Sequence, residues 1–255
     1  MALGLALAMF LPAVVRAQSC HMPDLHVDDG RPFRISARST FASYRTAIYA
    51  GEYQGYAASA SYSQRWLFVE GSLAGYRIVR NGLTDRGLGD LAVDVRGTIV
   101  RNQELAAGVE LAATFPTGDA GRGLGMGHTM LMPGVWASFQ RDSLSIVAQV
   151  AYGRAITAGG SHAHHGSSGA LVNPMNRSEL EHALTVSYGF AEHLFAGGRL
   201  LGALPVVAVG GAAREVAAFG FGASFAPLQL DLELQMPLVG TPFETRTLLT
   251  IAVLF

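Results

Sequence analysis

The sequence has little charge, a single cysteine and no excess of basic residues, and each shortage excludes something. Only 15% of the 255 residues are charged and the net charge is −1, so a nucleic-acid partner, which needs a basic surface, is excluded. Cys20 is the only cysteine, which rules out an intrachain disulfide. A good membrane helix is also missing, because the apolar stretch 194–213 contains Arg199, Pro205 and several glycines.

The amino-terminal residues have the pattern of an export signal. Residues 2–15 are apolar and lead into Val15-Arg16-Ala17, which predicts a signal peptide over 1–17 with cleavage after Ala17. A lipoprotein signal acylated at Cys20 is the alternative, although Ala17-Gln18-Ser19 matches that pattern poorly. Residues 18–32 are then expected to form a periplasmic lead-in, and residues 33–255 the folded domain.

The stretch 228–236 shows what kind of domain follows. Leucine or methionine occupies every even position and a polar residue every odd one. Successive side chains of a strand point to opposite faces, so this segment predicts a strand with one apolar and one polar face. A helix would distribute the same apolar residues around all its sides.

The same alternation recurs along the chain and predicts about twelve strands of about ten residues. Connections between them alternate between short and long, as in outer-membrane barrels with short periplasmic turns and longer external loops. The expected strands cover about 33–42, 54–63, 66–76, 90–99, 104–115, 127–140, 144–153, 179–188, 194–204, 216–225, 228–236 and 245–255.

The apolar faces have no partner within the chain, since the sequence offers neither an amphipathic helix nor a second sheet to cover them. Lipid is the remaining cover, and only a closed sheet satisfies the backbone there. The sequence therefore predicts an all-β protein, a closed antiparallel transmembrane β-barrel in the outer membrane of a Gram-negative bacterium. A soluble exported β-sandwich is the alternative.

Four short blocks in this order resemble a family of outer-membrane transporters associated with the phenol meta-pathway of degradation. They are Gly87-Leu88-Gly89-Asp90-Leu91, Phe115-Pro116-Thr117-Gly118-Asp119, Gly127-His128 through Pro133-Gly134, and Met236-Pro237-Leu238. The resemblance implies a barrel that passes small solutes, including hydrophobic or aromatic compounds. It supplies no catalytic residues.

The polar faces of the expected strands would line the lumen and carry charges of both signs. Mutual pairing of these charges would fill and rigidify a narrow interior, since barrels of about eight strands are plugged and those of 16–18 hold channels. Closure is expected to bring Arg34 and Arg38 beside Arg246, which in turn would adjoin acids of the 228–236 strand. The candidate lumen residues are Arg38, Asp90, Asp94, Arg96, Glu110, Asp231, Glu233 and Arg246.

Thioether and imidazole groups gather in two places that are expected to meet at the outer mouth. Met126, His128, Met130 and Met132 alternate along one expected strand, and the long loop after the next strand carries His162, His164 and His165. Such ligands suit copper or zinc, although the spacing matches no fixed metal motif. An apolar lumen wall beside a polar loop is the alternative; otherwise we expect no cofactor.

Two further expectations concern catalysis and assembly. An outer-membrane lipid hydrolase would need a serine beside an outward histidine, but Leu180 and Leu184 flank His182 on its face, so we expect no enzyme. The final strand ends in Phe255, and we expect the outer-membrane assembly machinery to recognise it. The lipid bilayer and a small solute are the other expected partners.

Overall fold

The computed structural model describes residues 31–45, 50–156, 175–206 and 212–255, and most of them lie in strands. Among the described residues, no helix is long and apolar enough to cross a membrane. One short 3-10 helix, η1 (Ala120–Arg122), lies in the connection between β6 and β7. The strands are β1 (Phe33–Arg45), β2 (Ala50–Gln64), β3 (Leu67–Arg80), β4 (Leu83–Leu88), β5 (Leu91–Arg101), β6 (Leu105–Phe115), β7 (Met130–Arg141), β8 (Leu144–Ala155), β9 (Ser178–Gly189), β10 (Leu194–Pro205), β11 (Arg214–Phe225), β12 (Leu228–Val239) and β13 (Phe243–Leu254).

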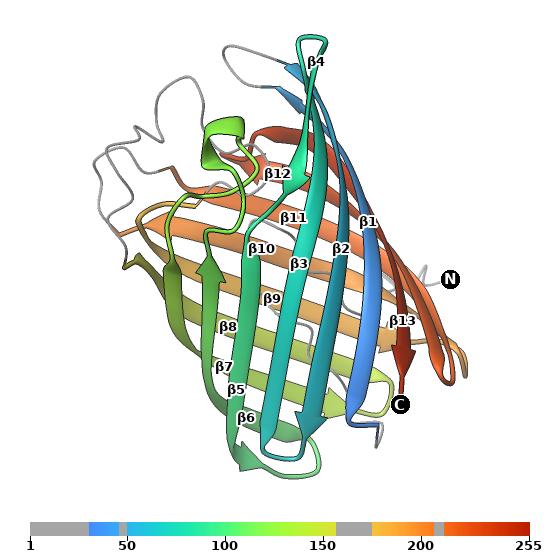
Figure 1. Ribbon diagram of the computed structural model, residues 1–255. Helices are drawn as coiled ribbons and strands as arrows, with labels where there is room; N and C mark the ends of the chain where they lie inside the picture. Colours follow the sequence, from blue (N-terminus) through green and yellow to red (C-terminus); the bar gives the residue numbers. More distant parts are fainter. Residues whose placement is uncertain (1–30, 46–49, 157–174, 207–211) are drawn as a thin grey trace, which may run out of the picture.

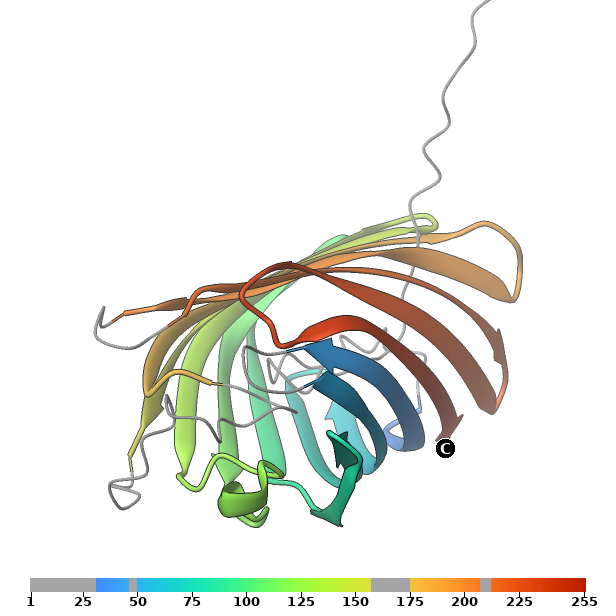
Figure 2. The ribbon, with the colours of Figure 1, turned by 90° about the horizontal axis from the view of Figure 1, so that it is seen from above.

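These strands form a single antiparallel sheet that closes on itself. Apart from β4 and β5, each strand pairs with its neighbour in sequence, and β13 returns to pair with β1, with Arg34 opposite Leu254 and Arg38 opposite Thr250. β4 and β5 both pair with β3, β4 along Gly75–Arg80 and β5 along Leu67–Ser72. Together they act as one interrupted strand, so the wall is a closed barrel of twelve strands, as predicted. Figure 2 looks down on the sheet and shows the strands enclosing the interior.

The two faces of the wall differ as the alternation predicts. On β12, Leu230 and Leu232 are 37% and 42% exposed on the outer surface, whereas the intervening Asp231 and Glu233 are each 4% exposed in the interior. Ile251 and Phe221 on the neighbouring strands lie on the outside as well. An apolar exterior around a closed hydrogen-bonded sheet is the arrangement that a bilayer requires.

The fourth strand departs from the expected layout. A long loop was expected after residue 76, but β3 continues to Arg80 and turns tightly into β4. Asn81 and Gly82 form that turn with φ of 47° and 84°, the left-handed conformation of a two-residue type I′ hairpin, for which Asn-Gly is a strong signal. The prediction of a loop here was wrong because this signal was overlooked. The hairpin rises above the rest of the wall (Figure 1).

The seventh strand also begins later than expected. β7 starts at Met130 rather than near residue 127, so Met126 and His128 belong to the connection that precedes it. Both side chains are nevertheless 2% exposed. Both side chains are therefore buried, although the two residues lie in a connection and not on the expected strand.

Candidate functional site

The interior of the barrel is the candidate site, and it is lined with buried charged groups. Among the described residues, seven acidic side chains and five arginines are buried within the wall. The predicted lumen residues Arg38, Asp94, Arg96, Glu110, Asp231, Glu233 and Arg246 are all among them. The remaining buried charged side chains are Arg34, Glu70, Glu179, Glu181 and Arg214.

One charged network joins β5, β6 and β8. Arg96 Nε lies 3.2 Å from Asp94 Oδ2 on its own strand and 3.6 Å from Glu110 Oε2 on the next. Gln149 Nε2 on β8 donates to the same Glu110 oxygen at 2.7 Å. Ion pairs at this depth need such additional hydrogen bonds, because two charges removed from water are costly to bury otherwise.

A second network joins β12, β13 and β2, and its register differs from the expected one. Gln235, not Asp231 or Glu233, lies opposite Arg246. The Arg246 guanidinium donates to Gln235 Oε1 at 2.6 Å and to the Tyr53 hydroxyl at 3.2 Å. Gln235 Nε2 in turn donates to Glu233 at 2.5 Å, and Arg199 lies 3.5 Å from Glu233. An amide therefore links the basic and acidic groups that sequence reasoning placed side by side.

A third network lies where β9 and β11 approach the long connections. Arg214 donates to both carboxylate oxygens of Glu179 at 2.9 Å. Asn176 donates from its backbone and side chain to the same carboxylate at 2.8 and 2.7 Å, and also pairs with the backbone of Ala212. Sequence reasoning missed Arg214 because it began the strand at Val216. Arg214, Val216 and Ala218 are alternate residues of one strand and all face the interior.

The methionines near the outer mouth form one cluster. Met126, Met130 and Met132 are each at most 2% exposed and pack with Met175, which precedes β9. His128 lies between them in the chain and is equally buried. The histidines His162, His164 and His165 lie outside the described residues. Within the described residues, no three His, Cys, Asp or Glu side chains are grouped closely enough to hold a metal ion.

Asp90 lies in the break between β4 and β5 rather than on a strand. Its two carboxylate oxygens accept hydrogen bonds from the backbone N–H groups of Gly118 and Met126 at 3.0 and 2.7 Å. Thr117 Oγ1 donates to Gly89 O and accepts from Leu91 N, both at 2.8 Å. Two of the four blocks that carry the family resemblance thus meet here, together with Met126 just before the third, and they hold the β6–β7 connection against the wall.

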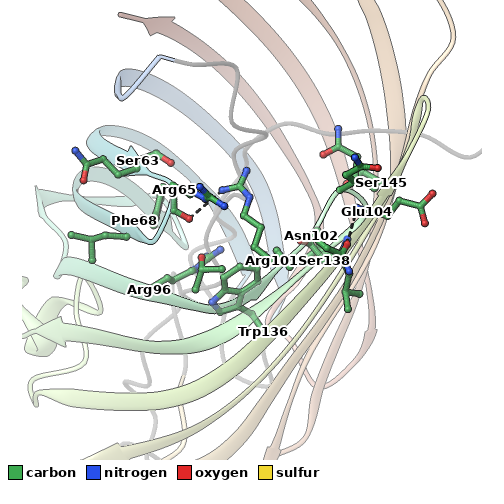
Figure 3. A pocket seen from close by; sticks show the side chains of 18 residues that line it. Ser63, Arg65, Phe68, Arg96, Arg101, Asn102, Glu104, Trp136, Ser138 and Ser145 are labelled. Carbon is green, nitrogen blue, oxygen red and sulfur yellow. Dashed lines mark hydrogen bonds between the residues drawn. The ribbon is translucent and has the colours of Figure 1, made fainter.

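A cavity of about 130 Å³ opens at the other end of the barrel, among the short turns. In outer-membrane barrels the short turns face the periplasm. Arg96, Phe68 and Trp136 line the inner part of the cavity, whereas Arg65 comes from the β2–β3 turn and Arg101 from the end of β5 (Figure 3). The cavity is therefore a periplasmic vestibule with aromatic and basic walls.

His182 and Glu215 form an ion pair on the membrane-facing wall near the outer rim. His182 Nε2 on β9 lies 3.1 Å from Glu215 Oε1 on β11. The two side chains meet across Gly202 of β10, where a Cβ would lie within 2.6 Å of the Glu215 carboxylate. Leu180 and Leu184, the neighbours of His182 on the same face, are exposed apolar residues. The histidine is thus paired with a carboxylate, not with a hydroxyl nucleophile.

The comparisons with known proteins concern the fold. No protein-family model matches the sequence, and no curated protein matches it either. Among solved structures, an outer membrane channel from Pseudomonas putida F1 superimposes with a TM-score of 0.69 at 11% identity, covering 91% of this chain and 100% of that one. The NanC porin gives 0.57 at 11% identity, with 87% and 98% covered. The translocator domain of the autotransporter NalP from Neisseria meningitidis gives 0.50 at 13%, with 89% of each chain covered.

These likenesses agree with what the wall requires on physical grounds. The first of these solved structures is an outer membrane channel and the second a porin, and the first is matched over its entire length. The apolar exterior, the closed sheet and the shared fold lead to one conclusion. The chain is a transmembrane β-barrel of the outer membrane.

Proposed function

We propose that the protein is a passive channel for small solutes, aromatic compounds among them, and that it is not an enzyme. The observation that carries the proposal is the contrast between the two faces of one wall. Buried arginines and carboxylates line the inside, whereas leucines such as Leu230 and Leu232 cover the outside. Polar side chains enclosed by an apolar barrel make a pathway for solutes through a bilayer.

The width of the pathway follows from the number of strands and from what fills it. Twelve strands lie between the eight of a filled barrel and the 16–18 of an open porin. The inward side chains are closely packed, with Tyr53 and Arg246 each 1% exposed and Ile78 fully buried. We therefore expect a small conductance, well below that of an open porin.

The aromatic part of the proposal is supported by the rings inside the barrel and by the resemblance to transporters associated with phenol degradation. Tyr44, Tyr53, Tyr76, Trp136 and Phe243 are all buried in the interior. Such rings offer favourable stacking or edge contacts to a ring-bearing solute. We infer on these grounds that the protein is related to that transporter family.

Planar-bilayer recording of the refolded protein tests the channel. We expect discrete conductance steps that phenol reduces and that a non-aromatic solute of similar size does not. Absence of any steps from folded, inserted protein would contradict the channel. Steps that both solutes reduce equally would contradict the preference for aromatic compounds.

A second candidate function, binding of copper or zinc at the outer mouth, is favoured by the clustering of Met126, Met130, Met132 and Met175, with a buried His128 between Met126 and Met130 in the chain. Thioether sulfur suits Cu(I), and imidazole suits copper and zinc. His162, His164 and His165 on the long connection between β8 and β9 would complete the site.

Metal titration of the purified protein tests this candidate. Replacing His162, His164 and His165 with alanine should weaken copper or zinc affinity, while His193→Ala, far from the outer mouth, should leave it unchanged. Equal affinity in all three proteins, or none in any, would contradict metal binding and leave the methionines as a surface for an aromatic solute.

A further inference from the structure

The periplasmic cavity combines three features that together specify a ligand. We propose that it binds a small carboxylate carrying one aromatic ring, such as benzoate, as the solute leaves or enters the barrel. The proposal rests on the channel function and names its substrate class and one of its binding sites.

The aromatic walls of the cavity come from two strands of the barrel. Phe68 on β3 and Trp136 on β7 both line it, and Trp136 is 7% exposed. The guanidinium of Arg96 lies 5.2 Å from the centre of the Phe68 ring, which fixes the ring's orientation by a cation–π contact. A flat ring entering the cavity would therefore meet aromatic surface on rigid strands rather than on loops.

The positive charge comes from the turns at the mouth. Arg65 and Arg101 are exposed and line the mouth with Asn102 and Gln103. Arg101 donates to the backbone carbonyl of Arg65 at 3.1 Å, which ties the two turns together. Arg96 attracts an anionic ligand less strongly than Arg65 and Arg101, because Asp94 and Glu110 already lie beside its guanidinium.

The lining residues include one acid, Glu104, against the three arginines Arg65, Arg96 and Arg101. Glu104 lies across the cavity from Arg65 (Figure 3), and Arg141 approaches its carboxylate at 3.7 Å. The hydroxyl groups of Ser63, Thr98 and Ser138 provide further donors for carboxylate oxygens. An anion is therefore favoured over a cation at this mouth.

The size of the cavity is sufficient for one aromatic ring. The space measures about 130 Å³, whereas a water occupies about 30 Å³ in the liquid and an apolar cavity of about 150 Å³ in a protein holds one benzene. One six-membered ring fits the inner part, with its carboxylate directed toward Arg65 and Arg101.

Trp136 itself can report binding, because the chain has only two tryptophans. In a Trp66→Phe background, the fluorescence of Trp136 is titrated with benzoate, with the neutral benzamide and with acetate. We expect saturable binding of benzoate, with benzamide and acetate each at least about tenfold weaker. Arg65→Gln and Arg101→Gln should each weaken benzoate about two- to fivefold, the effect of one partly exposed charge, and benzamide hardly at all.

The control is Arg45→Gln, which removes the same charge from the far end of the barrel, where Arg45 pairs with Glu244. Equal binding of benzoate and benzamide, or equal losses in the mouth variants and in Arg45→Gln, would overturn the site. Bilayer conductance of the same protein separates the two proposals. If the protein conducts but does not bind benzoate, the channel proposal stands and the binding site is contradicted. If it binds benzoate but does not conduct, the binding site stands and the channel proposal is contradicted.

Discussion

The guanidinium of Arg214 on β11 donates to both oxygens of the Glu179 carboxylate on β9, each at 2.9 Å, across the intervening strand β10. Ala203 is the residue of β10 opposite Arg214, and its small side chain leaves room for the pair to meet. Glu179 has no exposed surface. The pair and Asn176 together fasten the ends of two long connections to the wall.

Loss of one partner from this pair should be costly. Arg214→Met leaves the Glu179 carboxylate buried without its cation, and we expect a loss of about 3–5 kcal/mol in the free energy of unfolding. Urea unfolding in lipid vesicles, followed by tryptophan fluorescence, measures it. The double variant Arg214→Met/Glu179→Met should recover part of the loss, because Asn176 then lacks its acceptor, and a double variant less stable than the single one would contradict the pairing argument.

The apolar exterior can be tested at two depths. Leu232→Arg places a charge in the middle of the outer face of β12 and should cost about 2–4 kcal/mol, whereas Leu238→Arg near the outer rim should cost at most about 1 kcal/mol. Both leucines are exposed on the same face of the same strand. Equal costs for the two variants in vesicle unfolding would contradict a bilayer around this wall.

The external hairpin offers a test by pH. Hydrogen bonding to Arg80, with a further contribution from Arg122, holds the pKa of Asp85 below its usual range. The lowered pKa means that this contact stabilises the fold above the ordinary aspartate pKa, and the contribution is lost as the pH falls through the lowered value.

A carbon-13 NMR titration of the aspartate carboxyl groups measures this shift. We expect the pKa of Asp85 to return toward its usual range in Arg80→Gln. Arg86→Gln, on the same short strand, serves as the control and should leave it lowered. An unchanged Asp85 pKa in Arg80→Gln would show that another group holds it.

The carboxyl-terminal residue offers a test of assembly. Phe255 exchanges two backbone hydrogen bonds with Phe33, at 3.3 and 2.8 Å, and its ring is 60% exposed on the outside. Deleting Phe255 should lower the yield of folded barrel in cells by removing both this closure and the end of the strand that the assembly machinery would recognise. Phe225→Ser removes an exposed ring from another strand end, and an equal loss of yield there would argue against a special role for the terminus.

Several features of the fold follow from local sequence. The alternation in 228–236 is sufficient to define an inner and an outer face, because the period of a strand is two and the leucines have no other cover in the chain. The same rule placed Asp94, Arg96 and Glu110 on the inner side, where the structure has them buried. The Asn81-Gly82 turn was also readable, since its left-handed conformation needs those residue types.

Other features depend on which strands become neighbours. Arg246 contacts Gln235 and Tyr53 because closure and register place those residues opposite or beside it. The expected acidic partners, Asp231 and Glu233, lie on the same strand as Gln235 but at other positions in the register. Asp90 holds Gly118 and Met126, residues far along the chain, only because the β6–β7 connection folds back against the break in the wall.

The periplasmic cavity also depends on which strands become neighbours. Each of Arg65, Phe68, Arg101 and Trp136 is unremarkable in the sequence, and nothing in their spacing predicts that they line one space. The sequence by itself determined that the chain builds a barrel with polar contents, because alternation is a local property of each strand. The contacts that could recognise a solute were decided by the tertiary structure alone, because they join side chains from strands whose distance is set by closure of the sheet.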